Sequence, residues 1–353
     1  MFDINFFMKA HSILNELEKN KTLNKPDLVE IFESFREKRP VVYNIETTNA
    51  CNMKCQMCPR TKLMTRQVET IDKNTFIKII EQITPHNESD WMKWEEFIAR
   101  EYGIPQNGMG ENHFFLYVIP KVLQLHGYGD PLLDKNMPFY VKVLSEKKIP
   151  SYFSCNPINI DIEKTERILE RGLTYIKYSI ESVDDYTHKR IRGKASDFSK
   201  SYSKILQLLD LKKVKGYGTT IVITMLDLNR EKQAEEFKLL KQAFQGLDVY
   251  IYLKSEDQQW YRKDFHGTCS IHWSEFCKHP WMSMTIKSNG EVAMCMEDFN
   301  NEIILGDAKK QSLYEIWNGE KYRTFRDAHF NLNGSIKCTE RCDMKMIGKL
   351  VKE

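Results

Sequence analysis

The sequence predicts an α/β fold, a parallel sheet or barrel built from right-handed βαβ units between residues 41 and 254. The first observation is that short apolar segments, typical of strands, alternate there with longer segments of helical periodicity. The second is that several of these segments end at turn or capping residues such as Gly172 and Gly246. Strands that alternate with helices are joined by right-handed crossovers, which make the strands parallel. With 353 residues, the chain is long enough for about two domains.

The expected elements follow one another in a regular order. Residues 40–46 form the first expected strand, which leads directly into a cysteine-rich loop. A helix with Asp72 as its N-cap follows, because its apolar side chains recur on one face. The remaining strands are expected at 123–127, 152–157, 175–180, 219–225 and 249–253, and the remaining helices at 161–171, 198–211 and 231–244.

Three segments lie outside this alternation. Residues 1–40 have helical periodicity and are expected to form an N-terminal helical extension on the surface of the larger body. Residues 85–122 are an insertion rich in aromatic side chains, expected to form either an extra helical pair packed on the barrel or a lid or wall for the substrate. Residues 255–353 are expected to form a linker and a small α+β domain, with a hairpin turn at 288–290 and a helix around 312–328.

The composition excludes several classes of function. The chain has 52 basic and 49 acidic residues and a net charge of +3, which argues against nucleic-acid and membrane partners. No apolar run approaches the roughly 20 residues of a membrane span, and the first residues lack the features of a signal peptide. We therefore expect a cytoplasmic protein, in which the nine cysteines stay reduced and serve metal binding or reactivity.

The first group of cysteines is the pattern C-x3-C-x2-C, formed by Cys51, Cys55 and Cys58 in the loop after the first strand. A structural zinc site needs four ligands, so the fourth would have to come from elsewhere, for example from His86 or His113. A [4Fe–4S] cluster fits better, because three thiolates hold three irons and leave one iron open to a substrate or cofactor.

The second group consists of four cysteines in the C-terminal part of the chain: Cys277, Cys295, Cys338 and Cys342. Four thiolates can complete a tetrahedral zinc site or saturate a [4Fe–4S] cluster, and the spacing does not decide between the two. Two cysteines remain. Cys155 lies in an apolar strand and is expected to pack as a small buried hydrophobe, and Cys269 is expected to be a free thiol.

With its C-x3-C-x2-C loop after the first strand, the segment 41–254 resembles the radical S-adenosylmethionine (SAM) enzymes. The resemblance implies a partial (β/α)6 barrel in which SAM chelates the open iron of a [4Fe–4S] cluster through its amino and carboxylate groups. It also implies reductive cleavage of SAM to a 5′-deoxyadenosyl radical, with the electron supplied by a flavodoxin- or ferredoxin-type donor.

The resemblance assigns candidate SAM contacts at the ends of successive strands. Gly129 and Asp130 are similar to the Gly-Glu of the family's Gly-Glu-Pro element, which binds the SAM ammonium, although the aspartate is one methylene shorter. Arg192 resembles an arginine that meets the SAM carboxylate, and Met57 replaces an aromatic residue beside the adenine. The remaining candidates, similar to residues near the ribose or methionine, are Asn156, Ser179 and Glu181. For each polar candidate, capping of a strand end or a turn is the alternative.

The C-terminal domain resembles the auxiliary-cluster domains called SPASM and, in a shortened form, twitch. The pattern from Cys277 through Gly290 to Cys295 and the segments 305–307 and 312–318 carry this resemblance. It implies that the second group of cysteines binds an auxiliary [4Fe–4S] cluster. Because no cysteine follows Cys342, we expect the one-cluster twitch form, as in the twitch-containing amino-cyclitol dehydrogenases that the chain resembles.

The resemblance favours an oxidoreductase that acts on a small polyol, a sugar or an amino-cyclitol. An auxiliary cluster with four protein ligands is expected to transfer electrons, which favours a two-electron dehydrogenation. The alternatives are epimerisation or dehydration of a sugar, with Cys269 as a candidate hydrogen donor for epimerisation, and maturation of a ribosomal peptide. A zinc-binding interaction protein is the alternative from another class. His126, beside the Gly-Tyr-Gly-Asp turn, is a candidate substrate contact or a core histidine.

Overall fold

The structure, a computed structural model, describes residues 1–20, 25–255 and 277–331. Within these ranges it contains one nine-stranded sheet, in the order β6-β5-β4-β3-β2-β1-β7-β8-β9. The strands are β1 (Val42–Ile45), β2 (Leu123–Gln124), β3 (Ser151–Cys155), β4 (Tyr175–Ser179), β5 (Thr220–Asp227), β6 (Val249–Ser255), β7 (Met284–Ile286), β8 (Glu291–Ala293) and β9 (Ile304–Asp307). Strands β1 to β6 and the β1–β7 pair are parallel, whereas β8 and β9 are antiparallel. The sheet is open, with β6 and β9 at its edges, so the expected partial barrel is confirmed.

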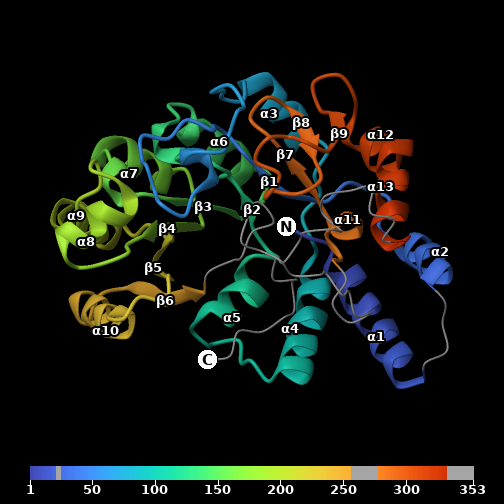
Figure 1. The fold of residues 1–353 in the computed structure, drawn as a ribbon, viewed down its shortest axis with the longest axis horizontal. Coiled ribbons are helices and arrows are strands. Elements are labelled where there is room, and N and C mark those ends of the chain that lie inside the picture. Colours follow the sequence, from blue (N-terminus) through green and yellow to red (C-terminus); the bar gives the residue numbers. More distant parts are fainter. Residues whose placement is uncertain (21–24, 256–276, 332–353) are drawn as a thin grey trace.

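The helices fall into three groups (Figure 1). The helices of the βα units are α3 (Lys73–Ile80), α6 (Met137–Glu146), α7 (Ile162–Glu170), α8 (Asp185–Arg192), α9 (Phe198–Lys215) and α10 (Gln233–Ala243). The N-terminal segment and the insertion form α1 (Ile4–Asn20), α2 (Lys25–Phe35), α4 (Glu88–Tyr102), α5 (Glu111–His113) and the π-helix η2 (Phe114–Val118). The C-terminal part adds α11 (His279–Met282), α12 (Leu313–Asn318) and α13 (Glu320–Asn331). None of the described helices is long and apolar enough to cross a membrane.

Most expected elements occur within a few residues of their predicted positions, and three differ. The helices α6 and α8 were not expected; α8 is a polar segment that buries only His188 and Ile191 and begins at the N-cap Asp184. The helix expected around 312–328 is two helices, α12 and α13. They separate at Gly319, which is extended and where a Cβ would lie 2.7 Å from the Glu315 carbonyl oxygen.

One hydrophobic core joins the βα units to the C-terminal part. It contains Ile45 of β1, Ile286 of β7 and Trp317 of α12, all fully buried. The N-terminal Met1 also belongs to this core. Because β1 and β7 are neighbours in the sheet, the C-terminal domain is built directly onto the barrel edge.

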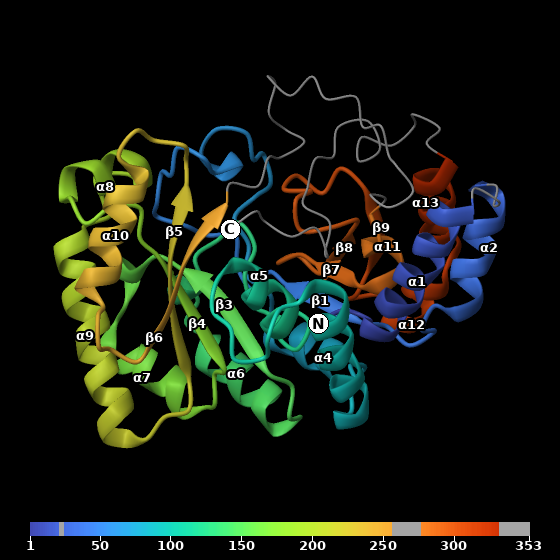
Figure 2. The ribbon, with the colours of Figure 1, turned by 90° about the horizontal axis from the view of Figure 1, so that it is seen from below.

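The N-terminal helices and the insertion pack together on the side of β1. Helix α1 contacts α4, and α2 contacts α13. The two helices of each pair lie side by side in Figures 1 and 2. Trp94 of α4 is fully buried against Phe2 and Phe7, with ring centroids 5.7 and 5.3 Å apart. The first half of the insertion therefore forms an extra helix that packs against the N-terminal segment, as the first of its two interpretations predicts.

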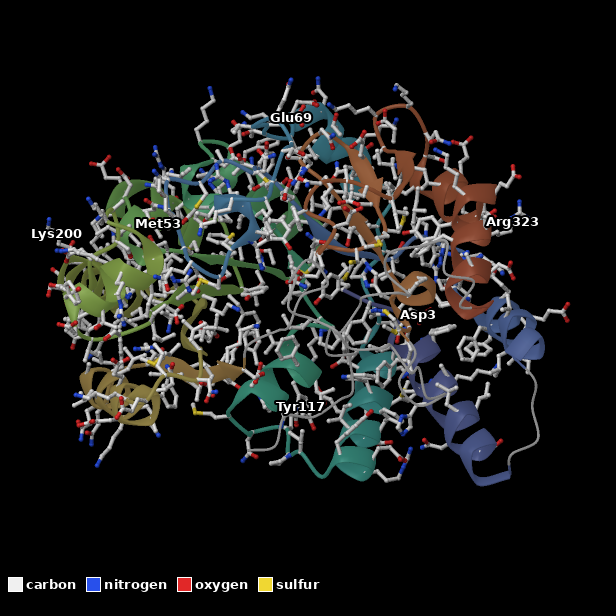
Figure 3. The ribbon with its side chains drawn as sticks, in the orientation of Figure 1. Asp3, Met53, Glu69, Tyr117, Lys200 and Arg323 are labelled. Carbon is white, nitrogen blue, oxygen red and sulfur yellow. The ribbon has the colours of Figure 1, made fainter. Side chains whose placement is uncertain are left out.

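The second half of the insertion supports the open side of the barrel. Phe114 of η2 packs against Tyr152 of β3 and Tyr252 of β6, with ring centroids 5.5 and 5.3 Å apart. The Glu111 carboxylate accepts hydrogen bonds from the backbone N–H and the hydroxyl of Ser255 at the end of β6. The insertion thus places Phe114 against the inner face of the sheet. We call the layer formed by Phe114, Tyr152 and Tyr252 the aromatic floor. Figure 3 shows Tyr117 in this region, away from Lys200 and Arg323 at the two ends of the molecule.

Candidate active site

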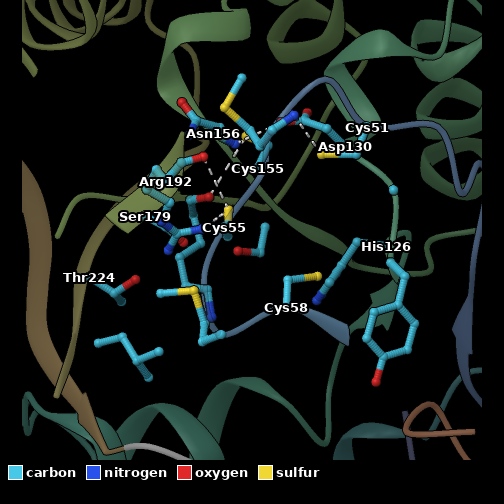
Figure 4. A pocket seen from close by; sticks show the side chains of 18 of the residues that line it. Cys51, Cys55, Cys58, His126, Asp130, Cys155, Asn156, Ser179, Arg192 and Thr224 are labelled. Atoms are coloured by element: carbon cyan, nitrogen blue, oxygen red, sulfur yellow. Dashed lines mark hydrogen bonds between the residues drawn. The ribbon is translucent and has the colours of Figure 1, made fainter. Parts of the chain in front are cut away.

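A cavity of about 300 Å³ lies at the carboxyl ends of the parallel strands (Figure 4). The site residues expected from the first cysteine group and from the SAM contacts all line it: Cys51, Cys55, Met57, Cys58, Gly129, Asp130, Asn156, Ser179, Glu181 and Arg192. Arg192 is the last residue of α8, and the others come from loops or strand ends after β1, β2, β3 and β4, which meet at one edge of the sheet. Cys277 and Cys295 are described but lie elsewhere, and Cys269, Cys338 and Cys342 lie outside the described residues.

The cysteine loop is held by the end of α8. The backbone N–H groups of Lys54 and Gln56 donate to the carbonyl oxygens of Arg192 and Ile191, at 3.1 and 2.9 Å. Burial raises the pKa of the Cys51 thiol and raises that of Cys58 to about 11. Because metals bind the thiolate form, cluster binding at this loop must release protons.

The residues Arg192 and Glu181 form a buried ion pair beside this loop. The second carboxylate oxygen of Glu181 accepts the backbone N–H of Leu226 at 2.9 Å. The Arg192 Nη1 lies 3.7 Å from the Cys55 Sγ. Burial alone would lower the pKa of Arg192, but Glu181 and Cys55 raise it above its ordinary value. The arginine is therefore charged, and it links the end of β4 to the cysteine loop.

Two of the polar candidates also cap turns, the alternative raised for them above. The Asp130 carboxylate accepts the backbone N–H groups of Leu132 and Asn156 at 3.0 and 2.9 Å, and the side-chain amide of Asn159 at 2.8 Å. The Asn156 amide oxygen accepts the N–H of Ile158 at 3.0 Å. Burial raises the pKa of Asp130. Both side chains line the cavity, so they shape it through the turns that they fix.

Gly129 stands where the turn after β2 touches the loop after β1. A Cβ at this position would lie 2.1 Å from the Thr48 carbonyl oxygen and 2.8 Å from the Asn49 Cα. The backbone N–H of the next residue, Asp130, donates a hydrogen bond to the carbonyl oxygen of Ala50 at 2.8 Å. Only glycine fits between these two backbones.

We expect Gly129→Ala to disrupt the cavity, because the two backbones would have to separate. The variant should lose both thermal stability and iron bound at the cysteine loop. Gly216→Ala is the control, since a Cβ at Gly216, the first residue after α9, meets no atom within 4 Å, although its φ of +70° adds a backbone cost of about 1–2 kcal/mol. Equal iron content in the Gly129 and Gly216 variants, measured after reconstitution, would contradict the prediction.

Several lining residues were missed in the sequence: Ser154, Lys177, Thr224, Leu226, Lys254, Met296 and Glu297. The first five lie on the inner face of β3 to β6, where alternate residues point to the same side. The two-residue spacing of Lys177 and Ser179 is the one signal that could have indicated this face. Met296 and Glu297 come from the C-terminal part, and only the folded structure brings them to the cavity.

His126 lies in the cavity wall (Figure 4). Its ring makes an edge contact with Tyr152 at 5.1 Å between centroids. Its Nδ1 is buried and has no hydrogen-bond partner among the described residues. Burial, with a contribution from Lys177, lowers the pKa of His126 to about 3. The imidazole is therefore neutral at physiological pH, and it lines the cavity.

A buried charge centre at Glu46 connects the cavity to the C-terminal part. Both carboxylate oxygens accept from Arg66 Nη2 at 2.7 and 2.9 Å, and one also accepts the Ser288 hydroxyl at 3.0 Å. The other carboxylate oxygen accepts the backbone N–H of Tyr128 at 3.1 Å, and the Tyr128 hydroxyl donates to Glu297 at 2.9 Å. The network fixes the position of Glu297 in the cavity wall.

The donor set of the cysteine loop fits an iron–sulfur cluster. In residues 1–20, 25–255 and 277–331, no three Cys, His, Asp or Glu side chains are grouped to hold a single metal ion. A cluster does not need such a group, because its thiolates bind different irons. His86 and His113, the possible fourth zinc ligands, contact the carbonyl oxygens of Phe2 and Gln106, both at 2.8 Å, and neither lines the cavity.

Cys155 behaves as a small buried residue, as expected. It is 6% exposed, and burial raises the pKa of its thiol well above the ordinary value. Its Sγ lies 3.7 Å from the carbonyl oxygen of Lys177. The thiol is therefore protonated although it lines the same cavity as the three clustered cysteines.

Comparison with known families and structures agrees with this geometry. The model of the radical SAM superfamily matches residues 45–240, and that of the SPASM iron–sulfur cluster-binding domain matches residues 277–343. No curated protein matches the chain.

Solved structures with a similar fold include two that cover most of the chain. SuiB from Streptococcus suis is 13% identical, with 98% of this chain and 88% of SuiB covered and a TM-score of 0.57. BtrN in complex with AdoMet and 2-DOIA is 16% identical, with 85% of this chain and 92% of BtrN covered and a TM-score of 0.49. At these identities the likeness is one of fold.

Proposed function

The chain belongs to the radical SAM superfamily and carries a C-terminal SPASM domain, and we propose from this premise that it dehydrogenates a small polyol, a sugar or an amino-cyclitol. Membership makes the chain a radical SAM enzyme, with a [4Fe–4S] cluster and SAM as cofactors and an auxiliary iron–sulfur cluster in the SPASM domain. The zinc-binding interaction protein considered above is therefore set aside.

The observation that carries the proposal is the composition of the cavity wall. The cavity is lined by the three cysteines of the first group and also by Met296 and Glu297 of the C-terminal domain. Cys295 immediately precedes Met296, so an auxiliary cluster held there would border the substrate space. Such a neighbour is suited to accept an electron from a substrate, which favours dehydrogenation.

The residues of this chain hold and orient the reactants. Cys51, Cys55 and Cys58 would bind the first cluster, and Arg192 beside Cys55 supports negative charge on that thiolate. When bound, the reduced cluster and SAM supply a 5′-deoxyadenosyl radical that takes a hydrogen atom from a substrate C–H bond. The buried rings of Phe114, Tyr152 and Tyr252 below the cavity would limit the access of water from that side, which would protect a reactive radical.

The overall change in the substrate is a loss of two hydrogens from a CH–OH group. The carbon hydrogen leaves as an atom and ends in 5′-deoxyadenosine. The hydroxyl hydrogen would leave as a proton, and an auxiliary cluster held by the second group of cysteines would accept the remaining electron. The carbon–oxygen bond becomes a carbonyl, so the substrate is oxidised by two electrons.

Anaerobic reconstitution tests the proposal. We expect about eight irons per chain, from two [4Fe–4S] clusters, and formation of 5′-deoxyadenosine from SAM and dithionite. A turnover in deuterated water then separates the reactions: a carbonyl product indicates dehydrogenation, whereas solvent deuterium on a substrate carbon indicates epimerisation. A protein without iron, or without 5′-deoxyadenosine, would overturn the proposal.

A further inference from the structure

The guanidinium group of Arg192 lies between the cysteine loop and the residue that follows β4 (Figure 4). Its Nη1 lies 3.7 Å from the Sγ of Cys55, and its Nη2 pairs with the Glu181 carboxylate. Cys55 is 7% exposed and Glu181 is fully buried. A cation therefore lies against one sulfur of the cluster-binding loop, at a place where solvent screens its charge poorly.

The loop is attached to the end of α8 by backbone groups. The N–H groups of Lys54 and Gln56 donate to the carbonyl oxygens of Arg192 and Ile191. These two hydrogen bonds do not involve the guanidinium group, so they remain possible when the Arg192 side chain is replaced. The contact between Arg192 Nη1 and Cys55 is therefore separate from the attachment of the loop.

Cluster binding changes which hydrogen bonds the Cys55 sulfur forms. As a thiol, it donates to the backbone carbonyl oxygen of Arg192, 3.7 Å away. A metal cluster binds the thiolate, which has no proton to donate and accepts hydrogen bonds instead. The guanidinium Nη1 is then its charged donor, and charge-assisted hydrogen bonds are stronger than neutral ones. By contrast, the Sγ of Cys51 accepts a neutral donor, the backbone N–H of Met53 at 3.4 Å.

Glu181 positions this arginine and offsets part of its charge. The carboxylate oxygen that does not pair with Arg192 accepts the backbone N–H of Leu226 at 2.9 Å. The backbone carbonyl oxygen of Glu181 accepts a hydrogen bond from Arg230 Nη2 at 2.7 Å. Both the side chain and the backbone of Glu181 are therefore held. The cysteine loop thus has a cation in contact with it and an anion behind that cation.

We propose that Arg192, balanced by Glu181, sets the reduction potential of the [4Fe–4S] cluster bound by the first group of cysteines. Net charge and hydrogen bonds to sulfur determine the potentials of such clusters. Reduction adds one electron, so a cation beside a thiolate stabilises the reduced cluster more than the oxidised one. Arg192 therefore raises the potential, and the Glu181 carboxylate limits the increase. The inference rests on the proposed function in one respect, that this loop binds the cluster, and it does not depend on the substrate.

A redox titration of the reconstituted protein with dithionite, followed by electron paramagnetic resonance, tests the inference. SAM is left out, so that a contact between Arg192 and SAM does not contribute. The signal that is absent from Cys58→Ala identifies the first cluster. At a given potential, Arg192→Met should lower the ratio of reduced to oxidised cluster at least about tenfold, which is about 59 mV for a one-electron couple. Glu181→Gln should shift this ratio in the opposite direction, because it leaves the cation unbalanced.

Two further variants separate charge from structure. Arg192→Lys keeps the positive charge, so its potential should lie closer to that of the native protein than the potential of Arg192→Met does. Arg190→Met is the matched control, because Arg190 belongs to the same helix but is exposed, and its potential should equal the native one. Thermal unfolding and iron content show whether each variant is folded and loaded before the titration.

An unchanged potential in loaded Arg192→Met would overturn the inference, and so would a shift of the same sign in Arg192→Met and Glu181→Gln. If Arg192→Met does not retain the first cluster, Glu181→Gln decides, since it keeps the arginine: an unchanged or lowered potential there rejects the inference. Failure of the proposed function has a different result. A native protein that binds both clusters and cleaves SAM but forms no carbonyl product rejects dehydrogenation and leaves the measured potentials valid.

Discussion

Cys58→Ala is expected to lower the iron content from about eight to about four per chain and to abolish the formation of 5′-deoxyadenosine. Three protein thiolates are the minimum that leaves one iron open to SAM, so loss of any one removes the site. The measurement is iron and sulfide analysis after anaerobic reconstitution, followed by chromatography of the nucleoside products.

Cys155→Ala is the matched control for this prediction. Cys155 lines the same cavity, but its thiol is buried and protonated, so its removal should leave the iron content unchanged. Loss of equal amounts of iron in the two variants would show that the cavity, and not the C-x3-C-x2-C pattern, determines cluster binding. Retention of all iron in Cys58→Ala would contradict the assignment of that ligand.

Glu46→Ala is expected to destabilise the protein by about 3–5 kcal/mol, because it leaves the buried Arg66 and Lys287 without their carboxylate. Urea unfolding measures this loss in the free energy of unfolding. The control is Glu146→Ala, which removes an exposed pair with Lys142 at 3.5 Å and should cost less than about 1 kcal/mol. Similar losses in the two variants would contradict the prediction.

The stability that Glu46 contributes should also depend on pH. Burial alone would raise the pKa of Glu46, but Lys287 and Arg66 together lower it below the ordinary value. A carboxyl group with a lowered pKa contributes stability above its unfolded pKa, about 4 for glutamate, and loses it as the pH falls through the folded pKa. The difference in stability between the native protein and Glu46→Gln should therefore shrink in acid. If the stability difference between the native protein and Glu46→Gln stays constant down to acid unfolding, the carboxylate of Glu46 is not its source.

The alternation of strands and helices could be predicted because it depends on local periodicity. The N-cap Asp72 is a local signal, and the structure confirms it through a hydrogen bond from the Thr75 N–H at 2.9 Å. Helix α8 was missed because its apolar content is too low for a periodic pattern. Its N-cap at Asp184 is local, since it accepts the backbone N–H of Thr187, but its contact with the cysteine loop joins residues far apart in the chain.

The candidate site also contains residues that the sequence predicts and residues whose roles depend on the tertiary structure. The cysteine loop and the strand-end residues are readable in the sequence, since each lies at a fixed place in a βα unit. The double role of Asp130, as a turn cap and a lining residue, depends on the position of Asn159 in the next loop. The two-residue spacing of Lys177 and Ser179 could indicate that they share a face, but only the pairing of β3 with β4 shows that Ser154 lies beside Lys177.

The sequence by itself indicated the family of this protein, because three cysteines at this spacing after a strand resemble the radical SAM pattern. It also determined the class of fold, because strand and helix periodicities are local. Only the tertiary structure decided what surrounds that chemistry. Glu46 and Arg66 reach Ser288 and Phe299 across more than 200 residues, and Glu297 enters the cavity beside Tyr128. Such contacts depend on which strands become neighbours in the sheet, and no local pattern carries that information.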